Sequence, residues 1–75
     1  MFKSEFIIKG MDCPSEERMI RMKLDNAEGI RKLDFEITKR KLTVFHTANN
    51  VGIINSLLEE LNLGTSMVSS VRTNE

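Results

Sequence analysis

The chain has 75 residues, of which 40% are apolar and 29% charged, a composition typical of one small globular domain and not of a disordered chain. Its 11 basic and 11 acidic residues cancel, and a neutral domain lacks the broad basic surface of a nucleic-acid-binding protein. The single cysteine excludes an internal disulfide, so the hydrophobic core must supply the stability.

No part of the sequence is typical of a membrane or secretory segment. Its apolar runs are far shorter than the roughly 20 residues that span a bilayer. The first ten residues carry Lys3, Glu5 and Lys9 between apolar side chains, which is not the pattern of a secretory signal. We therefore expect a cytoplasmic domain without direct membrane insertion.

The first predicted element is a strand over residues 2–9. Phe6 and Ile8 share one face in a period of two, with Glu5 on the opposite face. The glycine at position 10 breaks this alternation and opens a loop. The pattern indicates a strand with one face turned to the core.

A helix is predicted to begin at Pro14. A proline at the first helical position loses nothing by lacking an N–H, and this placement makes Cys13 the cap residue. The helix is expected to continue to the Glu-Gly pair at positions 28 and 29. Its apolar stripe consists of Ile20, Leu24 and Ala27, with Met19 and Met22 at the edges.

The next two segments are predicted to form a hairpin. From Ile30 the period changes to two, Lys39 and Arg40 make a polar turn, and the return strand runs to His46. One face of the hairpin is apolar, carrying Leu33, Phe35, Ile37, Leu42 and Val44. His46, at the end of a strand, is expected to be a surface or edge residue.

A second helix and a last strand complete the chain. Asn49 and Asn50 are suitable helix caps, residues 62–64 end the helix, and residues 65–71 form a strand followed by a loose tail. The helix stripe consists of Ile54, Leu57, Leu58 and Leu61. With right-handed crossovers, the order βαββαβ predicts an α+β ferredoxin-like sandwich: a four-stranded antiparallel sheet with two helices on one face. Residues 1–75 are expected to be a single domain.

The loop before the first helix holds the residues with the most chemical potential. Cys13 lies at a helix N-terminus, which stabilises a thiolate, whereas the carboxylates of Asp12, Glu16 and Glu17 repel one. A divalent cation would reconcile these groups because it favours their ionised forms. The residues alone leave another interpretation open, in which the acids complement the helix dipole and Cys13 packs as a small apolar side chain.

Residues 10–13, Gly-Met-Asp-Cys, followed by Ile20, Leu24 and the Glu-Gly-Ile of residues 28–30, resemble the heavy-metal-associated domain of soft-metal chaperones and metal-exporting P-type ATPases. The resemblance extends over about residues 6–71. The usual family motif is Gly-Met-x-Cys-x-x-Cys, and here Glu16 stands in place of the second cysteine. The sequence Asp-Cys-Pro-Ser-Glu-Glu is similar to a variant loop, Asp-Cys-Pro-Thr-Glu-Glu, of domains attached to zinc, cadmium and lead exporters.

The resemblance implies a non-enzymatic module that binds and transfers a divalent Zn, Cd or Pb ion, as a small carrier or an exporter-associated domain. The implied metal ligands are Asp12, Cys13, Glu16 and Glu17. Mixed sulfur and oxygen donors suit such ions better than a monovalent soft ion. The implied partner is a metal-exporting P-type ATPase or a like domain. A metal-bridged homodimer would also restore two thiolates, one Cys13 from each chain.

The resemblance also bears on residues near the loop. Met11 is expected to turn inward and pack, and Leu63 replaces an aromatic residue that shields the metal loop in the family. Met19, Met22 and Met67 are expected to pack and not to bind metal.

A second hypothesis belongs to another class: a ferredoxin-like interaction or regulatory domain with a degenerate metal loop, acting through a sheet edge or a helix face. An enzyme is not expected, because the sequence has no Gly-rich phosphate loop and no histidine near Cys13 to activate its thiol.

Overall fold

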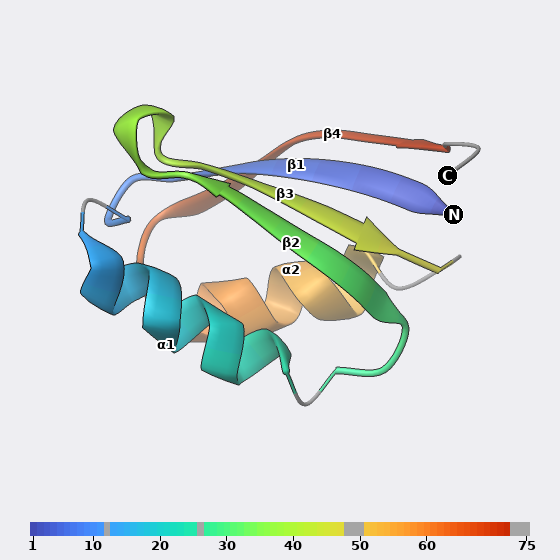
Figure 1. Ribbon diagram of the computed structural model, residues 1–75, viewed down its shortest axis with the longest axis horizontal. Coiled ribbons are helices and arrows are strands. Elements are labelled where there is room, and N and C mark those ends of the chain that lie inside the picture. The colour runs from blue at the N-terminus through green and yellow to red at the C-terminus, as the bar shows by residue number, and fades with distance from the viewer. Residues whose placement is uncertain (12, 26, 48–50, 73–75) are drawn as a thin grey trace.

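The computed structural model describes residues 1–11, 13–25, 27–47 and 51–72. Their elements, in chain order, are β1 (Phe2–Ile8), α1 (Pro14–Leu24), β2 (Ile30–Glu36), the 3₁₀ turn η1 (Ile37–Lys39), β3 (Lys41–His46), α2 (Val51–Glu60) and β4 (Thr65–Arg72). The strands form one antiparallel sheet in the order β2-β3-β1-β4, and both helices cover the same face (Figure 1). The predicted ferredoxin-like sandwich is confirmed.

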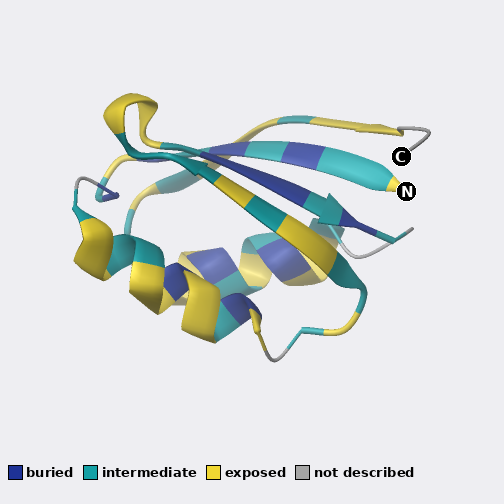
Figure 2. Cartoon of the chain, viewed as in Figure 1, coloured by how far each residue is buried: buried dark blue, intermediate teal, exposed yellow. Residues whose placement is uncertain are grey.

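The core lies between the sheet and the two helices. Phe6 and Ile8 are fully buried from β1, as their alternation predicted, and Met11 is buried beside them. Figure 2 shows the buried positions on the helix and strand faces that look toward each other. The buried apolar residues are Phe6, Ile8, Met11, Ile20, Leu24, Leu42, Val44, Ile54 and Leu58.

Helix α1 ends earlier than the sequence pattern predicted. It stops at Leu24, and the N–H of Asp25 closes the last turn on the carbonyl of Arg21 at 2.9 Å. Ala27, predicted to continue the stripe, lies in the turn that leads to Gly29, whose φ is 84°. Aspartate favours local backbone hydrogen bonds over helix interiors, and glycine accepts a positive φ at little cost.

The predicted hairpin of β2 and β3 is present, with η1 between the strands. Ile37 belongs to this 3₁₀ turn and not to the strand, and Arg40 leaves the turn with a φ of 53°. The predicted second helix and last strand are also present as α2 and β4. The predicted caps of that helix, Asn49 and Asn50, lie outside the described residues.

His46 was expected at the surface or an edge, and that expectation is wrong. The residue is 1% exposed because it shares the inward face of β3 with Leu42 and Val44, and β3 is an interior strand. Its Nδ1 lies 2.9 Å from the carbonyl of Thr47, and its Nε2 lies 2.7 Å from the hydroxyl of Ser4. A carbonyl only accepts, so Nδ1 donates and Nε2 of the neutral ring accepts from Ser4.

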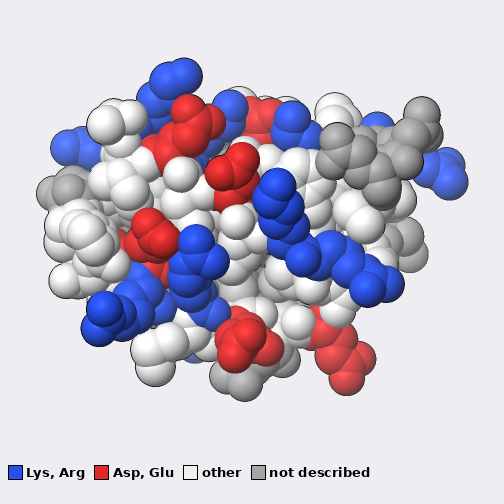
Figure 3. Space-filling view, in the orientation of Figure 1, with Lys and Arg blue, Asp and Glu red and all other residues white. Residues whose placement is uncertain are grey.

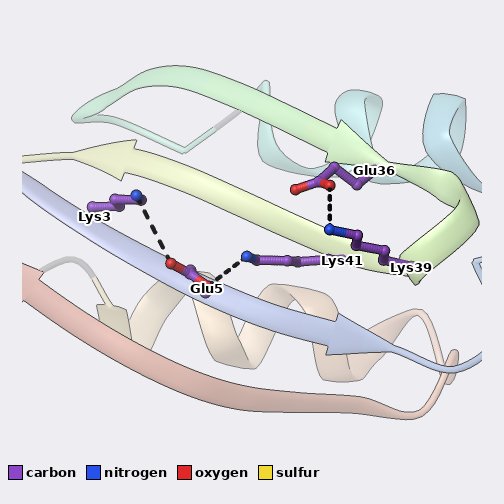
Figure 4. A network of polar contacts seen from close by, with 5 residues as sticks. All are labelled: Lys3, Glu5, Glu36, Lys39 and Lys41. Carbon is purple, nitrogen blue, oxygen red and sulfur yellow. Dashed lines mark ion pairs between the residues drawn. The ribbon is translucent and has the colours of Figure 1, made fainter.

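The outward face of the sheet carries paired charges (Figure 4). Glu5 on β1 lies 2.8 Å from Lys41 on β3 and 3.9 Å from Lys3. The hydrogen bond with Lys41 holds the pKa of the Glu5 carboxyl below its ordinary value of 4.5. The same bond raises the pKa of Lys41. A separate pair joins Glu36 and Lys39 at 3.5 Å across η1.

The start of β1 and the β1–α1 loop lie at opposite ends of the sheet. Phe2 pairs with Arg72, so the start of β1 and the end of β4 lie side by side. The loop from β1 to α1 lies at the opposite end of the molecule (Figure 1). Among the described residues, no helix has the length and apolar character needed to cross a bilayer.

Replacing Ser4 with Ala should lower the free energy of unfolding by about 1–3 kcal/mol, because the buried Nε2 of His46 would lose its hydrogen-bond donor. Urea denaturation followed by circular dichroism measures the change. Ser66→Ala, at an exposed position of β4, is the matched control and should change stability by less than about 0.5 kcal/mol. Equal effects of the two substitutions would contradict this account of the histidine.

Ionised Glu5 should stabilise the fold only above the range in which it becomes protonated. The pKa of Glu5 is lower in the folded state than its ordinary value of 4.5. The stabilisation by ionised Glu5 is therefore complete above pH 4.5, and it is lost as the pH falls through the pKa of the folded state. The stability of the wild type should therefore fall toward that of Glu5→Gln under acid conditions. Denaturation of both proteins across this pH range measures the convergence. In a Lys41→Met background, the pH-dependent difference in stability between proteins with Glu5 and with Gln at position 5 should shrink. An unchanged difference would contradict the conclusion that the hydrogen bond with Lys41 stabilises ionised Glu5.

Candidate metal centre

The loop between β1 and α1 is fixed by backbone hydrogen bonds on both sides. The N–H of Gly10 donates to the carbonyl of Leu63 at 2.7 Å, and the N–H of Met11 donates to the carbonyl of Ile8 at 3.0 Å. Met11 then turns into the core with no exposed surface, in agreement with the predicted packing role. The loop therefore leaves the sheet in a defined direction, toward the start of α1.

Cys13 is the N-cap of α1, as predicted. Its backbone is extended, with φ −153° and ψ 165°, and Pro14 takes the first helical position. The carbonyl of Cys13 accepts from the N–H of Glu16 at 3.2 Å, whereas its side chain makes no capping hydrogen bond. The half-buried sulfur is therefore not engaged by the helix backbone and remains available to other groups.

The four predicted ligands do not all come together. Sγ of Cys13 donates a hydrogen bond to Oε1 of Glu16 at 2.8 Å, so these two side chains meet at the first turn of α1. Glu17 instead accepts a hydrogen bond from Nε of Arg21 at 3.0 Å, one turn further along the helix. Asp12 lies outside the described residues. Within the described parts of the chain, no three His, Cys, Asp or Glu side chains gather as a metal cluster.

Arg21 is a residue at this site that the sequence analysis did not identify. Besides its ion pair with Glu17, its guanidinium lies over the ring of Phe35 on β2, with Cζ 4.6 Å from the ring centroid. The spacing of four residues between an acid and a base was the available signal, since such pairs are neighbours on a helix. The ring contact, by contrast, depends on the packing of α1 against β2.

Leu63, predicted to stand where the family has an aromatic residue, packs against the β1–α1 loop. Its carbonyl oxygen lies 3.1 Å and its Cδ2 lies 3.2 Å from the place that a Cβ on Gly10 would occupy. The side chain is partly buried against the core. Close packing therefore favours glycine at position 10, because any larger residue would require Leu63 to shift by a few tenths of an ångström.

The outward side of α1 carries exposed methionines. Met19 is 43% and Met22 67% exposed, and Met67 on β4 is 50% exposed, so the predicted packing of these three residues is wrong. The buried stripe of α1 is narrow, since only Ile20 and Leu24 are buried. Figure 3 shows basic, acidic and uncharged side chains interspersed over α1 and β2. Two shallow grooves of about 230 and 300 Å³ meet at Met19 and Met22, the first also lined by Pro14, Ser15 and Arg18, the second by Lys23 and Leu61.

Several solved structures share this architecture. The N-terminal domain of a potential copper-translocating P-type ATPase from Bacillus subtilis, in its Cu(I)-loaded state, aligns with a TM-score of 0.81 at 21% identity, over 99% of this chain and 95% of that domain. A copper-binding domain from the P-type ATPase HMA7 aligns with a TM-score of 0.80 at 19% identity, over 93% of this chain and 97% of that domain. A chain of the yeast Atx1–Cu(I)–Ccc2a complex aligns with a TM-score of 0.81 at 16% identity, over 92% of this chain and 97% of that chain. This chain has the fold of a heavy-metal-associated domain.

No family model matches the sequence, and the comparison with curated proteins gives no significant match. The likeness to the heavy-metal-associated fold is therefore one of structure, at identities of 16–21% for the three structures described. In this chain Cys13 and Pro14 lie at the start of α1. The expected resemblance is confirmed at the level of the fold.

Gly10→Ala should lower the free energy of unfolding by about 1–3 kcal/mol, because the added methyl group would collide with Leu63 and displace the loop. Gly52→Ala is the matched control, since nothing lies within 4 Å of a Cβ at that exposed helical position. This second change should stabilise the protein by up to about 1 kcal/mol. Thermal denaturation of both variants measures the contrast, and a Gly10→Ala protein as stable as the wild type would contradict it.

Proposed function

We propose that this domain binds a divalent metal ion through Cys13 and Glu16 and transfers it to a partner protein. The observation that carries the proposal is the 2.8 Å approach of Sγ to Oε1 at the N-terminus of α1. In the metal-free protein the thiol donates a hydrogen bond to this carboxylate, and the two groups would repel each other at this distance once the thiol has lost its proton. A divalent cation between them removes the repulsion, which supports a metal-binding role for the pair.

The separation of the two atoms is compatible with a shared ion. Zinc binds sulfur at about 2.3 Å and carboxylate oxygen at about 2.0–2.2 Å, so two such donors in a tetrahedral site are about 3.6 Å apart. This is somewhat more than the 2.8 Å between Sγ and Oε1. A shared ion therefore requires the two atoms to separate, and rotation of the partly exposed Glu16 side chain would supply that movement.

The donor set favours a divalent ion. A thiolate pair suits Cu(I), and the similar structures include a copper-binding domain. In this sequence Glu16 stands where the motif that the loop resembles has its second cysteine. One sulfur with one or more carboxylates suits a borderline divalent ion, so Zn, Cd or Pb is the proposed cargo. Asp12 is proposed as an additional ligand because it precedes Cys13 directly in the sequence. The proposed role is non-enzymatic, since the ion is bound and passed on unchanged.

A site with so few donors supports transfer rather than storage. Two protein ligands leave coordination positions for water or for groups of a partner, which enter before Cys13 leaves. The proposed partner is a metal-exporting P-type ATPase or a similar domain in the cytoplasm, consistent with the likeness to the Atx1–Cu(I)–Ccc2a complex. A metal-bridged pair of these chains is the related alternative. The exposed Met19 and Met22, beside the loop, provide an apolar surface for the approach of either partner.

Metal titration of the reduced protein, by calorimetry with Zn(II), Cd(II), Pb(II) and Cu(I), tests this function. Removing a residue that only hydrogen-bonds to a metal ligand typically lowers metal affinity by roughly 10–100-fold. Cys13→Ser removes a ligand itself and should therefore lower the affinity for divalent ions by more than this. Glu16→Gln should weaken it on the order of tenfold. Glu59→Gln, which removes an exposed carboxylate from α2, is the control and should have little effect.

Binding of divalent ions that is equally strong in Cys13→Ser would contradict the proposed function. The second hypothesis, an interaction or regulatory domain with a degenerate loop, would then be favoured. Tighter binding of Cu(I) than of the divalent ions would retain a metal-binding role but contradict the proposed cargo.

A further inference from the structure

The two edge strands of the sheet differ in charge. The order β2-β3-β1-β4 leaves β2 and β4 at the edges (Figure 1), and proteins usually protect an edge strand from pairing with another chain by charged side chains. Strand β2 is protected in this way, since four of its seven residues are charged: Arg31, Lys32, Asp34 and Glu36. Strand β4 has eight residues, and only Arg72, at its end, is charged. Its edge therefore lacks the charges that would keep another strand away.

Apolar side chains are exposed on β4 and on the helix that packs against it. Met67 is 50%, Val68 59% and Val71 50% exposed. Ile53 on α2 is 59% exposed. Among the described residues, four of the seven large apolar side chains that are exposed thus belong to β4 and α2. A strand paired with this edge would remove part of their apolar surface from water.

A second copy of β4 fits this edge in the direction of its side chains. Two chains related by a two-fold rotation present the same strand to each other, and residues directly opposite on an antiparallel pair share one face. Thr65 lies opposite Ile8, and Arg72 lies opposite Phe2, on the face of β1 that looks toward the helices. A register that sets Thr65 of each chain against Arg72 of the other therefore matches inward to inward and outward to outward side chains.

A bulge in β4 makes this match possible. Thr65 and Arg72 are separated by an odd number of residues, which in a regular strand would place them on opposite faces. The pairing with β1 shifts between Glu5 and Phe6, so that Val68 is an extra residue and both ends of β4 share one face. The bulge interrupts the ladder at one point and leaves the residues on both sides of it able to pair.

The charges near β4 are complementary in this register. The two Arg72 residues lie at opposite ends of the paired strands, about 24 Å apart, so they do not repel each other. Each stands against Thr65 of the other chain, which follows the C-terminal end of α2. The backbone carbonyls at that helix end favour a positive charge, as do Glu59 and Glu60 in its last turn. The arrangement thus favours a second copy as the occupant of the edge.

We propose that β4 is a docking surface for a second copy of this chain, and that the two β4 strands pair antiparallel to form one continuous sheet. The two-fold axis passes between Val68 and Ser69. The β1–α1 loop is bonded to Leu63, just before β4 begins, so the two Cys13 residues lie toward opposite ends of the paired strands. This pair therefore needs no metal ion and is distinct from one bridged through Cys13.

Sedimentation equilibrium of the reduced protein in EDTA tests the inference. The dimer fraction should rise with protein concentration, in the wild type and equally in Cys13→Ser. Val68→Lys and Val68→Glu each place two like charges about 6 Å apart across the axis and should raise the dissociation constant on the order of tenfold. An equimolar mixture of these two variants should restore pairing, because opposite charges then meet. Met22→Lys and Met22→Glu, at an exposed position of α1, are the matched controls and should change nothing.

Cysteine trapping in the Cys13→Ser background tests the register. The Cα atoms of Ser69 in the two chains should lie about 6 Å apart, within the range that a disulfide spans. The Cα atoms of Ser66, on the same face of β4, should lie about 17 Å apart. With diamide as the oxidant, Ser69→Cys should therefore form a covalent dimer and Ser66→Cys should not. Circular dichroism verifies that both variants are folded.

A wild type that stays monomeric at every concentration would overturn the inference. A dimer that is lost in EDTA or in Cys13→Ser would also overturn it, while leaving the proposed function and its metal-bridged pair in place. A dimer that responds to the Met22 variants and not to those of Val68 would place the contact on α1 and contradict the role of β4. Equal trapping at positions 66 and 69 would overturn the antiparallel register.

Discussion

The hydrogen bond from the N–H of Gly10 to the carbonyl of Leu63 is the constraint on which the arrangement of the candidate site depends. It joins the end of β1 to the segment that enters β4, and it brings the two segments so close that a Cβ on Gly10 would lie 3.1 Å from the carbonyl oxygen of Leu63. Met11 is thereby directed into the core, and Cys13 follows at the start of α1. The sulfur is placed by these backbone contacts, and from there it donates a hydrogen bond to Oε1 of Glu16.

In the first turn of α1, the two glutamates point in different directions. Successive helical residues point about 100° apart, so neighbouring acids face different surroundings. Glu16 faces the cysteine at the helix end, whereas Glu17 faces Arg21 and, beyond it, the sheet. The helix N-terminus favours both carboxylates, but only one lies beside the thiol. The presence of both glutamates in the sequence therefore does not by itself determine which of them can act together with Cys13.

Much of the fold could be predicted from local patterns in the sequence. Alternation identified the inward face of β1 through Phe6 and Ile8, and Pro14 located the start of α1 to the residue. The end of α1 was harder, because Ala27 fits a helical stripe and only the turn at Gly29 shows that the chain has already left the helix. His46 was misplaced because its strand, β3, lies inside the sheet with its inward face under the helices, and strand order is not a local property.

The candidate site was predictable only in part, for the same physical reason. The contact of Cys13 with Glu16 follows from their spacing across a helix start, which the sequence contains. The contact of Arg21 with Phe35 joins elements that are separate in the sequence, so no local pattern indicates it. The exposure of Met19 and Met22 likewise depends on how narrow the buried stripe of α1 proves to be.

The position of the chain ends has a mechanical consequence. The start of β1 and the end of β4 are adjacent, and they lie at the opposite end of the molecule from the β1–α1 loop (Figure 1). A linker attached at either end would therefore leave on the far side from Cys13 and would not cover it. The domain can be tethered there, to a surface or to another domain, and still turn its thiol outward to reach a second protein.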